Sequence, residues 1–148
     1  MTACDPKEPV TKQCKFTKLN ERRSIVLGQA TIDFVAKDQP HGGWSLVLVE
    51  EGPWEETEIA DQLQRIQSRL YGCLDAVVDG QVSSAYPESV NKPIEIRIDA
   101  YNVFDVPLSR FFDAFSASVL EVPDYKSALE KNELVPSISF SLNCEQSN

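Results

Sequence analysis

Residues 55–79, EETEIADQLQRIQSRLYGCLDAVVD, decide how the rest of this chain must fold. At about 100° per residue their apolar side chains fall on one stripe of a helix. That stripe contains Ile59, Leu63, Ile66, Leu70, Cys73, Leu74 and Val77. Acidic residues occupy the first turn, where the helix dipole favours them, and Gly80 stands where a C-terminal cap belongs. The sequence predicts a long amphipathic helix that needs an apolar layer to cover it.

Segments of alternating polarity on either side of this helix can supply that layer. Residues 24–36, 44–49, 94–101 and 135–142 each alternate apolar and polar side chains, as half-buried strands do. The first reads as one long strand with a bulge or bend near Gly28. The loop between it and the second strand contains proline and two glycines, which predicts a β-hairpin.

A second helix is predicted over residues 107–122, followed by a short helical piece over 123–131. The stripe of this helix is rich in aromatic residues: Leu108, Phe111, Phe112, Phe115 and Val119. The element order is then β-β-α-β-α-α-β. We expect an α+β fold in two layers, a roughly four-stranded antiparallel or mixed sheet with one face covered by two main helices. The other face would be polar and open to water.

The length of 148 residues fits one domain. We divide it into a basic, mostly extended N-terminal arm (1–23), a single α+β domain (24–143) and a C-terminal tail (144–148). The formal net charge is −9. The arm holds six basic and three acidic residues, a net +3, so the remaining 125 residues carry −12. This acidity argues against nucleic acid or an anionic membrane as a partner.

The N-terminal residues, with Asp5, Glu8 and two prolines, do not read as a signal peptide, and no apolar run approaches the roughly 18 residues of a membrane span. We therefore expect a cytoplasmic protein. The four cysteines, Cys4, Cys14, Cys73 and Cys144, form no CxxC pair. In a cytosol they are expected to stay reduced.

Motifs for catalysis are scarce. The chain has one histidine, His41, in the predicted hairpin loop, and no GxSxG, GxGxxG or phosphate-binding loop sequence. Asp75 and Asp79 are spaced i,i+4 on the first helix, but no third metal ligand is implied. We predict no catalytic residue, no metal site and no cofactor, and we expect a protein that is not an enzyme.

An acidic segment next to an aromatic residue is the first candidate for partner binding. Between residues 50 and 61 there is no basic residue, and the candidate set is Glu50, Glu51, Trp54, Glu55, Glu56, Glu58 and Asp61. An aromatic anchor within a ring of carboxylates is typical of an interface with a basic protein. The alternative is an ordinary acidic helix start, with Trp54 folded back onto the helix as a hydrophobic staple.

The polar face of the third predicted strand is the second candidate surface, with Glu95, Arg97, Asp99 and Tyr101. Its carboxylates could serve a small enzyme as an acid–base pair if one of them were desolvated. The alternative is a set of salt links on a solvated sheet.

In size, acidity and lack of a catalytic set, the chain looks like a bacterial immunity protein of the kind paired with nuclease toxins. This likeness is one of class, and no sequence motif carries it. It implies a small acidic protein-binding module that neutralises a basic partner, the cognate toxin. A secretion chaperone is the alternative among binding proteins, and a small carboxylate-based enzyme is the alternative from another class.

Overall fold

The computed structural model describes residues 25–27, 30–37, 42–132 and 134–145. Its strands are β1 (Ile25–Leu27), β2 (Ala30–Ile32), β3 (Phe34–Lys37), β4 (Trp44–Glu51), β5 (Ile94–Tyr101) and β6 (Ile138–Glu145). Its α-helices are α1 (Ile59–Val78), α2 (Gln81–Ala85), α3 (Asp105–Ser118) and α4 (Pro123–Lys131). Short 3₁₀ turns precede α1 (η2, Glu56–Glu58), follow α2 (η3, Pro87–Ser89) and join α3 to α4 (η4, Val119–Glu121).

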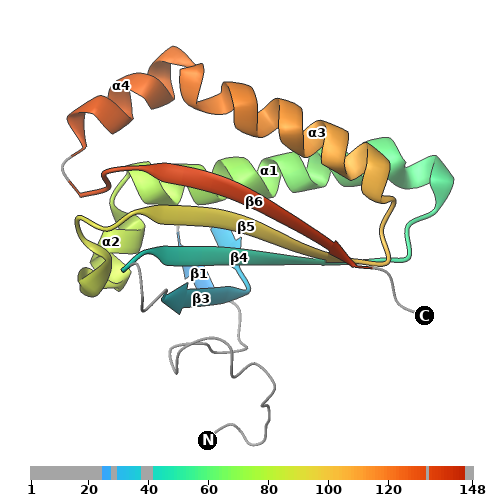
Figure 1. Ribbon diagram of the computed structural model, residues 1–148, viewed down its shortest axis with the longest axis horizontal. Helices are drawn as coiled ribbons and strands as arrows, with labels where there is room; N and C mark the ends of the chain where they lie inside the picture. The colour runs from blue at the N-terminus through green and yellow to red at the C-terminus, as the bar shows by residue number, and fades with distance from the viewer. Residues whose placement is uncertain (1–24, 28–29, 38–41, 133, 146–148) are drawn as a thin grey trace, which may run out of the picture.

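The main sheet has the strand order β3-β4-β5-β6, and it is mixed. β3 pairs antiparallel with β4, as the predicted hairpin requires, whereas β4, β5 and β6 run parallel. The predicted α+β fold with a four-stranded sheet against helices is therefore confirmed (Figure 1).

The order of the strands explains why both main helices cover the same face. The chain moves from β4 through α1 to β5, and then through α3 and α4 to β6, always in one direction across the sheet. Parallel crossovers are almost always right-handed, and two such crossovers made in the same direction place their helices on one side. The opposite face of β4, β5 and β6 is left without a helix among the described residues.

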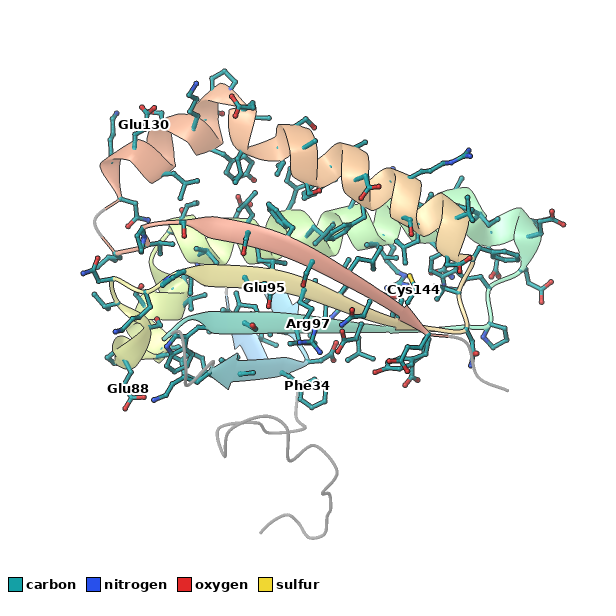
Figure 2. The ribbon with its side chains drawn as sticks, viewed as in Figure 1. Phe34, Glu88, Glu95, Arg97, Glu130 and Cys144 are labelled. Atoms are coloured by element: carbon teal, nitrogen blue, oxygen red, sulfur yellow. The ribbon has the colours of Figure 1, made fainter. Side chains whose placement is uncertain are left out.

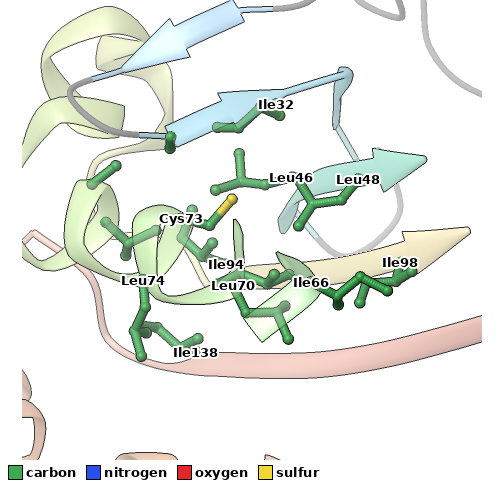
Figure 3. Close-up of a cluster of buried hydrophobic side chains, with 14 of the residues drawn as sticks. Ile32, Leu46, Leu48, Ile66, Leu70, Cys73, Leu74, Ile94, Ile98 and Ile138 are labelled. Atoms are coloured by element: carbon green, nitrogen blue, oxygen red, sulfur yellow. The ribbon is translucent and has the colours of Figure 1, made fainter. Parts of the chain in front are cut away.

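The core lies between α1 and the covered face of the sheet (Figure 3). Leu46, Ile96 and Ile98 from the strands and Ile66 and Leu70 from α1 are all fully buried. In β5, buried side chains alternate with half-buried ones up to Tyr101, which is exposed, as the sequence pattern predicts. Each fully buried aliphatic side chain contributes about 1.5–3 kcal/mol to stability.

Residues 24–36 differ from the single long strand that we expected. β1 and β2 form a separate antiparallel hairpin, with Leu27 opposite Ala30, and only β3 joins the main sheet. The predicted bulge or bend near Gly28 falls on residues outside the described part of the chain, and the described residues on either side of it pair with each other and do not continue as one strand. The hairpin lies against α1 and buries Ala30 and Ile32. Burial against the helix takes the place of further pairing in the sheet.

Strand β6 begins later and ends later than predicted, so Cys144 and Glu145 belong to the strand and not to the tail. The predicted arm at residues 1–23 and the loop residue His41 lie outside the described part of the chain. No helix within the described residues combines the length and the apolar character that crossing a bilayer requires.

Candidate partner-binding site

The two candidate surfaces meet where the parallel strands end (Figure 1). Glu51 from the first set stands beside Tyr101 from the second, and Tyr101 stands beside Glu145. The Gly52 amide donates to the Tyr101 carbonyl over 2.8 Å, and the Asn102 amide donates to the Glu145 carbonyl over 2.9 Å. Backbone hydrogen bonds thus tie the three strand ends together.

Gly52 lets the loop after β4 approach the loop after β5 closely. A Cβ atom at Gly52 would collide with the carbonyl oxygen of Asn102. Asn102 itself has a φ of 58°, in the left-handed region that asparagine tolerates better than most residues. The two loops therefore hold the start of α1 and the start of α3 at one end of the sheet.

Exposed carboxylates gather at this end. We call the following residues the acidic end: Glu51, Glu55, Glu56, Glu58, Asp61, Asp105 and Glu145, all exposed. Some of them also stabilise the helix starts, since Asp61 and Asp105 lie in first turns and Glu58 accepts a 3.1 Å hydrogen bond from the Glu55 amide. All of these carboxylates are exposed to a partner that approaches the strand ends.

The negative charge of the acidic end affects the pKa of the Tyr101 hydroxyl. Burial raises the pKa of the Tyr101 hydroxyl, and the carboxylates of Asp99 and Glu145 raise that pKa further. Glu51 acts in the same direction, while Arg97 opposes it. The acidic residues of three neighbouring strands therefore act together at one point of the surface.

Glu50 does not belong to this surface, contrary to our expectation. Its side chain is 3% exposed and forms ion pairs with Arg65 and Arg69 of α1, the latter at 2.7 Å. The two arginines are spaced i,i+4, so both reach the same strand from the helix. A charge read from the sequence as part of an acidic face is thus neutralised inside the protein.

Arg69 links α1 to β4, to β2 and to the β2–β3 connection through its guanidinium. It donates to Glu50 on β4, to Asp33 between β2 and β3 at 3.0 Å, and to the backbone carbonyl of Thr31 in β2. Burial lowers the pKa of Arg69, but the hydrogen bonds to Glu50 and Asp33 outweigh it, so that the pKa is raised. The network fastens the β1–β2 hairpin to the main sheet and to α1.

Trp54 is also buried, at 6% exposure, and belongs to the hydrophobic core. It cannot serve as the exposed anchor that we expected. Its indole Nε1 has no hydrogen-bond partner within the described structure. Directly after Gly52-Pro53 the chain therefore contributes a large apolar ring to the core.

On the second surface, where Glu95 and Arg97 lie on β5 (Figure 2), the carboxylates of Glu95 and Asp99 already accept hydrogen bonds. Arg97 binds both oxygens of Asp99, at 2.8 and 3.1 Å. Asp99 also accepts from the Asn143 amide at 3.2 Å, and Glu95 accepts from the Ser45 hydroxyl at 2.7 Å. This agrees with the reading of salt links along a sheet face. Tyr101, at 37% exposure, is the member that reaches the acidic end.

Sequence reasoning missed two apolar residues that lie in this region. Phe104 is 38% exposed and Val106 is 56% exposed, in the connection from β5 to α3 and in the first turn of α3. Both lie outside the aromatic stripe that begins at Leu108. Their position outside the predicted core stripe is the sequence signal that could have identified them as exposed.

Among the described residues no group of three or more histidine, cysteine, aspartate or glutamate side chains is arranged to hold a metal ion. Cys73 and Cys144 are free thiols. Burial raises the pKa of the Cys144 thiol, and nearby Asp105 adds to the effect.

Cys73 is expected to resist thiol reagents while the protein is folded. It is fully buried, and burial raises the pKa of its thiol to about 12, so both the reagent and the reactive thiolate are excluded. N-ethylmaleimide labelling at about pH 8, read by peptide mass mapping, should modify half-buried Cys144 much faster than Cys73. In guanidinium chloride the two rates should become similar. Equal rates in native buffer would contradict the placement of Cys73 in the core.

In comparisons with known proteins, no family model matches the chain, and neither a curated protein nor a solved structure matches it significantly.

Proposed function

We propose that this protein is a small acidic binding module that neutralises a basic protein partner, as an immunity protein neutralises a bacterial toxin such as a nuclease. The observation that supports this proposal is the acidic end, where exposed carboxylates from β4, η2, α1, α3 and β6 gather at the ends of three parallel strands.

The proposed mechanism is occlusion after electrostatic steering. A nuclease carries a cationic surface because it must hold phosphate groups, and the same surface attracts an acidic protein. Long-range attraction raises the association rate, and the bound module then blocks access to nucleic acid. Such a protein would act in the cytoplasm of the cell that makes the toxin.

The two alternative functions, a secretion chaperone and a small carboxylate-based enzyme, would each require a different observation. A secretion chaperone would bind an effector in place of a toxin, so a neighbouring gene for a secreted effector would favour it. A carboxylate enzyme would need a free acid or base, whereas Glu95 accepts a hydrogen bond from Ser45 and Asp99 is held by Arg97 and Asn143. The pairing of these carboxylates supports a binding role over an enzymatic one.

Reversal of the charges at the helix start is expected to slow association with the partner. The triple variant Glu55→Lys/Glu56→Lys/Glu58→Lys removes three exposed carboxylates of the acidic end. We expect association at least about tenfold slower at low salt, and weaker dependence of the rate on salt, because steering is lost. Folding should tolerate the change, since each lost dipole interaction costs about 0.3–1 kcal/mol.

The matched control is Glu121→Lys/Asp124→Lys/Glu130→Lys, which alters three exposed carboxylates of η4 and α4 and changes the net charge equally. Surface plasmon resonance against the protein encoded by the neighbouring open reading frame, at two ionic strengths, measures both variants. The first variant should associate several-fold more slowly than the control. Equal rates would place the binding surface elsewhere, and the absence of a complex with wild-type protein would reject the proposal.

A further inference from the structure

We propose that Tyr101, Phe104 and Val106 form the apolar anchor of the binding site, and that the partner is a cationic protein presenting an apolar side chain among lysines or arginines. This inference rests on the proposed function, because it places a contact centre within the acidic end.

Among the described residues, no ring contact accounts for the exposure of these three side chains. Large apolar side chains that are at least about a third exposed also occur at Val26, Tyr71, Val90, Val122 and Leu134, but these are distributed over separate elements. Tyr71 is explained by its neighbours, since its ring contacts Phe115 at 5.3 Å and stacks on Tyr125 at 6.2 Å. Tyr101, Phe104 and Val106, by contrast, come from six consecutive residues.

The local backbone holds this segment in place. Tyr101 is paired through β5 to Glu51 and Glu145, and Asn102 is hydrogen bonded to β6. The Phe104 carbonyl accepts a 3.2 Å hydrogen bond from the Leu108 amide at the start of α3. Val103 between them is 6% exposed and fixes the connection to the core. The anchor is therefore presented by an ordered connection, which limits the entropy lost on binding.

The charges around Tyr101, Phe104 and Val106 determine which kind of partner can bind there. Asp105 lies between Phe104 and Val106 in sequence, and Glu51 and Glu145 lie on either side of Tyr101 in the sheet. A second copy of this chain would bring like charges together, and an anionic membrane would be repelled. A cationic partner gains attraction from the rim while an apolar side chain enters the centre, the usual anatomy of a protein interface.

Two peptides of equal charge test this directly. Acetyl-KKFKK-amide and acetyl-KKSKK-amide, titrated into the full ¹⁵N-labelled chain, differ only in the central side chain. We expect changes in the amide chemical shifts of residues 101–106 and of the acidic end. The dissociation constant should be about tenfold lower for the phenylalanine peptide. This is the factor expected for burying roughly half of an aromatic side chain. The variant Phe104→Ser/Val106→Ser should bind both peptides equally and keep the amide spectrum of a folded chain, with a lowered melting temperature because the buried part of the Phe104 ring is lost. The control variant Val26→Ser/Val122→Ser should keep the tenfold preference.

Any other outcome rejects the proposal that Tyr101, Phe104 and Val106 form the apolar anchor. Equal affinity for the two peptides, together with slower association of the lysine triple variant above, would reject the anchor and leave the proposed function standing. Shifts that lie elsewhere, or no shifts at all, would reject the anchor, and the proposed function would then be judged by the association rates alone. Nuclear Overhauser contacts from the Phe104 ring to residues 1–23 would identify the chain's own basic arm as the occupant. Spectra of the free protein that change on dilution would identify a second copy.

Discussion

Leu70→Asp is expected to abolish cooperative folding. Leu70 lies in the middle of the α1 stripe, has no exposed surface and belongs to the core that joins α1 to the sheet. An aspartate there would bury a charge that has no partner, or would have to take up a proton to enter. A buried unpaired charge lowers the free energy of unfolding by more than about 4–5 kcal/mol, which is close to the whole stability of many domains.

The control is Ser68→Asp, which introduces the same side chain two residues earlier on the exposed side of α1. Thermal unfolding followed by near-ultraviolet circular dichroism should show a wild-type-like transition for Ser68→Asp and none for Leu70→Asp. A cooperative transition for Leu70→Asp within a few degrees of wild type would refute the packing of α1 against the sheet. The structure favours Leu70 over Leu63 for this test, because Leu63 is only half-buried.

The elements themselves could be predicted because periodicity is a local property. The stripe of α1 and the alternation in β5 follow from side-chain polarity and the repeat of helix or strand. Strand direction could not be predicted in the same way. A polar-out alternation fits an antiparallel or a mixed sheet equally, and the parallel pairing of β4, β5 and β6 follows only when the crossovers are placed.

The candidate site could be predicted only in part, because charge in the sequence carries no information about pairing across the fold. Glu50 and Glu51 are neighbours in β4, yet one is buried against Arg65 and Arg69 and the other is exposed. The meeting of Glu51 with Tyr101 depends on the register of two strands that are more than 40 residues apart. Such contacts belong to the tertiary structure.

Removal of Glu50 is expected to be the most destabilising change of a single charged residue. Glu50→Ala would leave Arg69, which is 19% exposed, with Asp33 as its remaining carboxylate partner. Breaking a buried ion pair by removing one partner costs about 3–5 kcal/mol, because the other charge stays desolvated. Glu50→Gln should cost less, since the amide oxygen can still accept hydrogen bonds from the guanidinium groups.

Glu121→Ala is the matched control, since Glu121 forms an ion pair with Lys126 at 3.7 Å in which both side chains are more than half exposed. Exposed pairs of this kind contribute about 0–1 kcal/mol. Urea unfolding of the three variants should therefore give a midpoint near wild type for Glu121→Ala, a lower one for Glu50→Gln and the lowest for Glu50→Ala. A loss for Glu50→Ala no larger than for the control would show that Glu50 is not desolvated.

A double variant separates the ion pair from the loss of packing at Glu50. In Glu50→Ala/Arg69→Met the arginine that would be left desolvated is replaced by an apolar side chain of similar length, so the guanidinium that loses Glu50 is removed together with it. We expect the double variant to be more stable than the sum of the two single losses predicts, with a coupling between 0.5 and 3 kcal/mol, roughly the range for groups in direct contact. The hydrogen bonds of Arg69 to Asp33 and to the Thr31 carbonyl are lost in both Arg69 variants, so they cancel in the comparison. Additive losses would mean that Glu50 and Arg69 contribute to stability independently, despite the 2.7 Å ion pair between them.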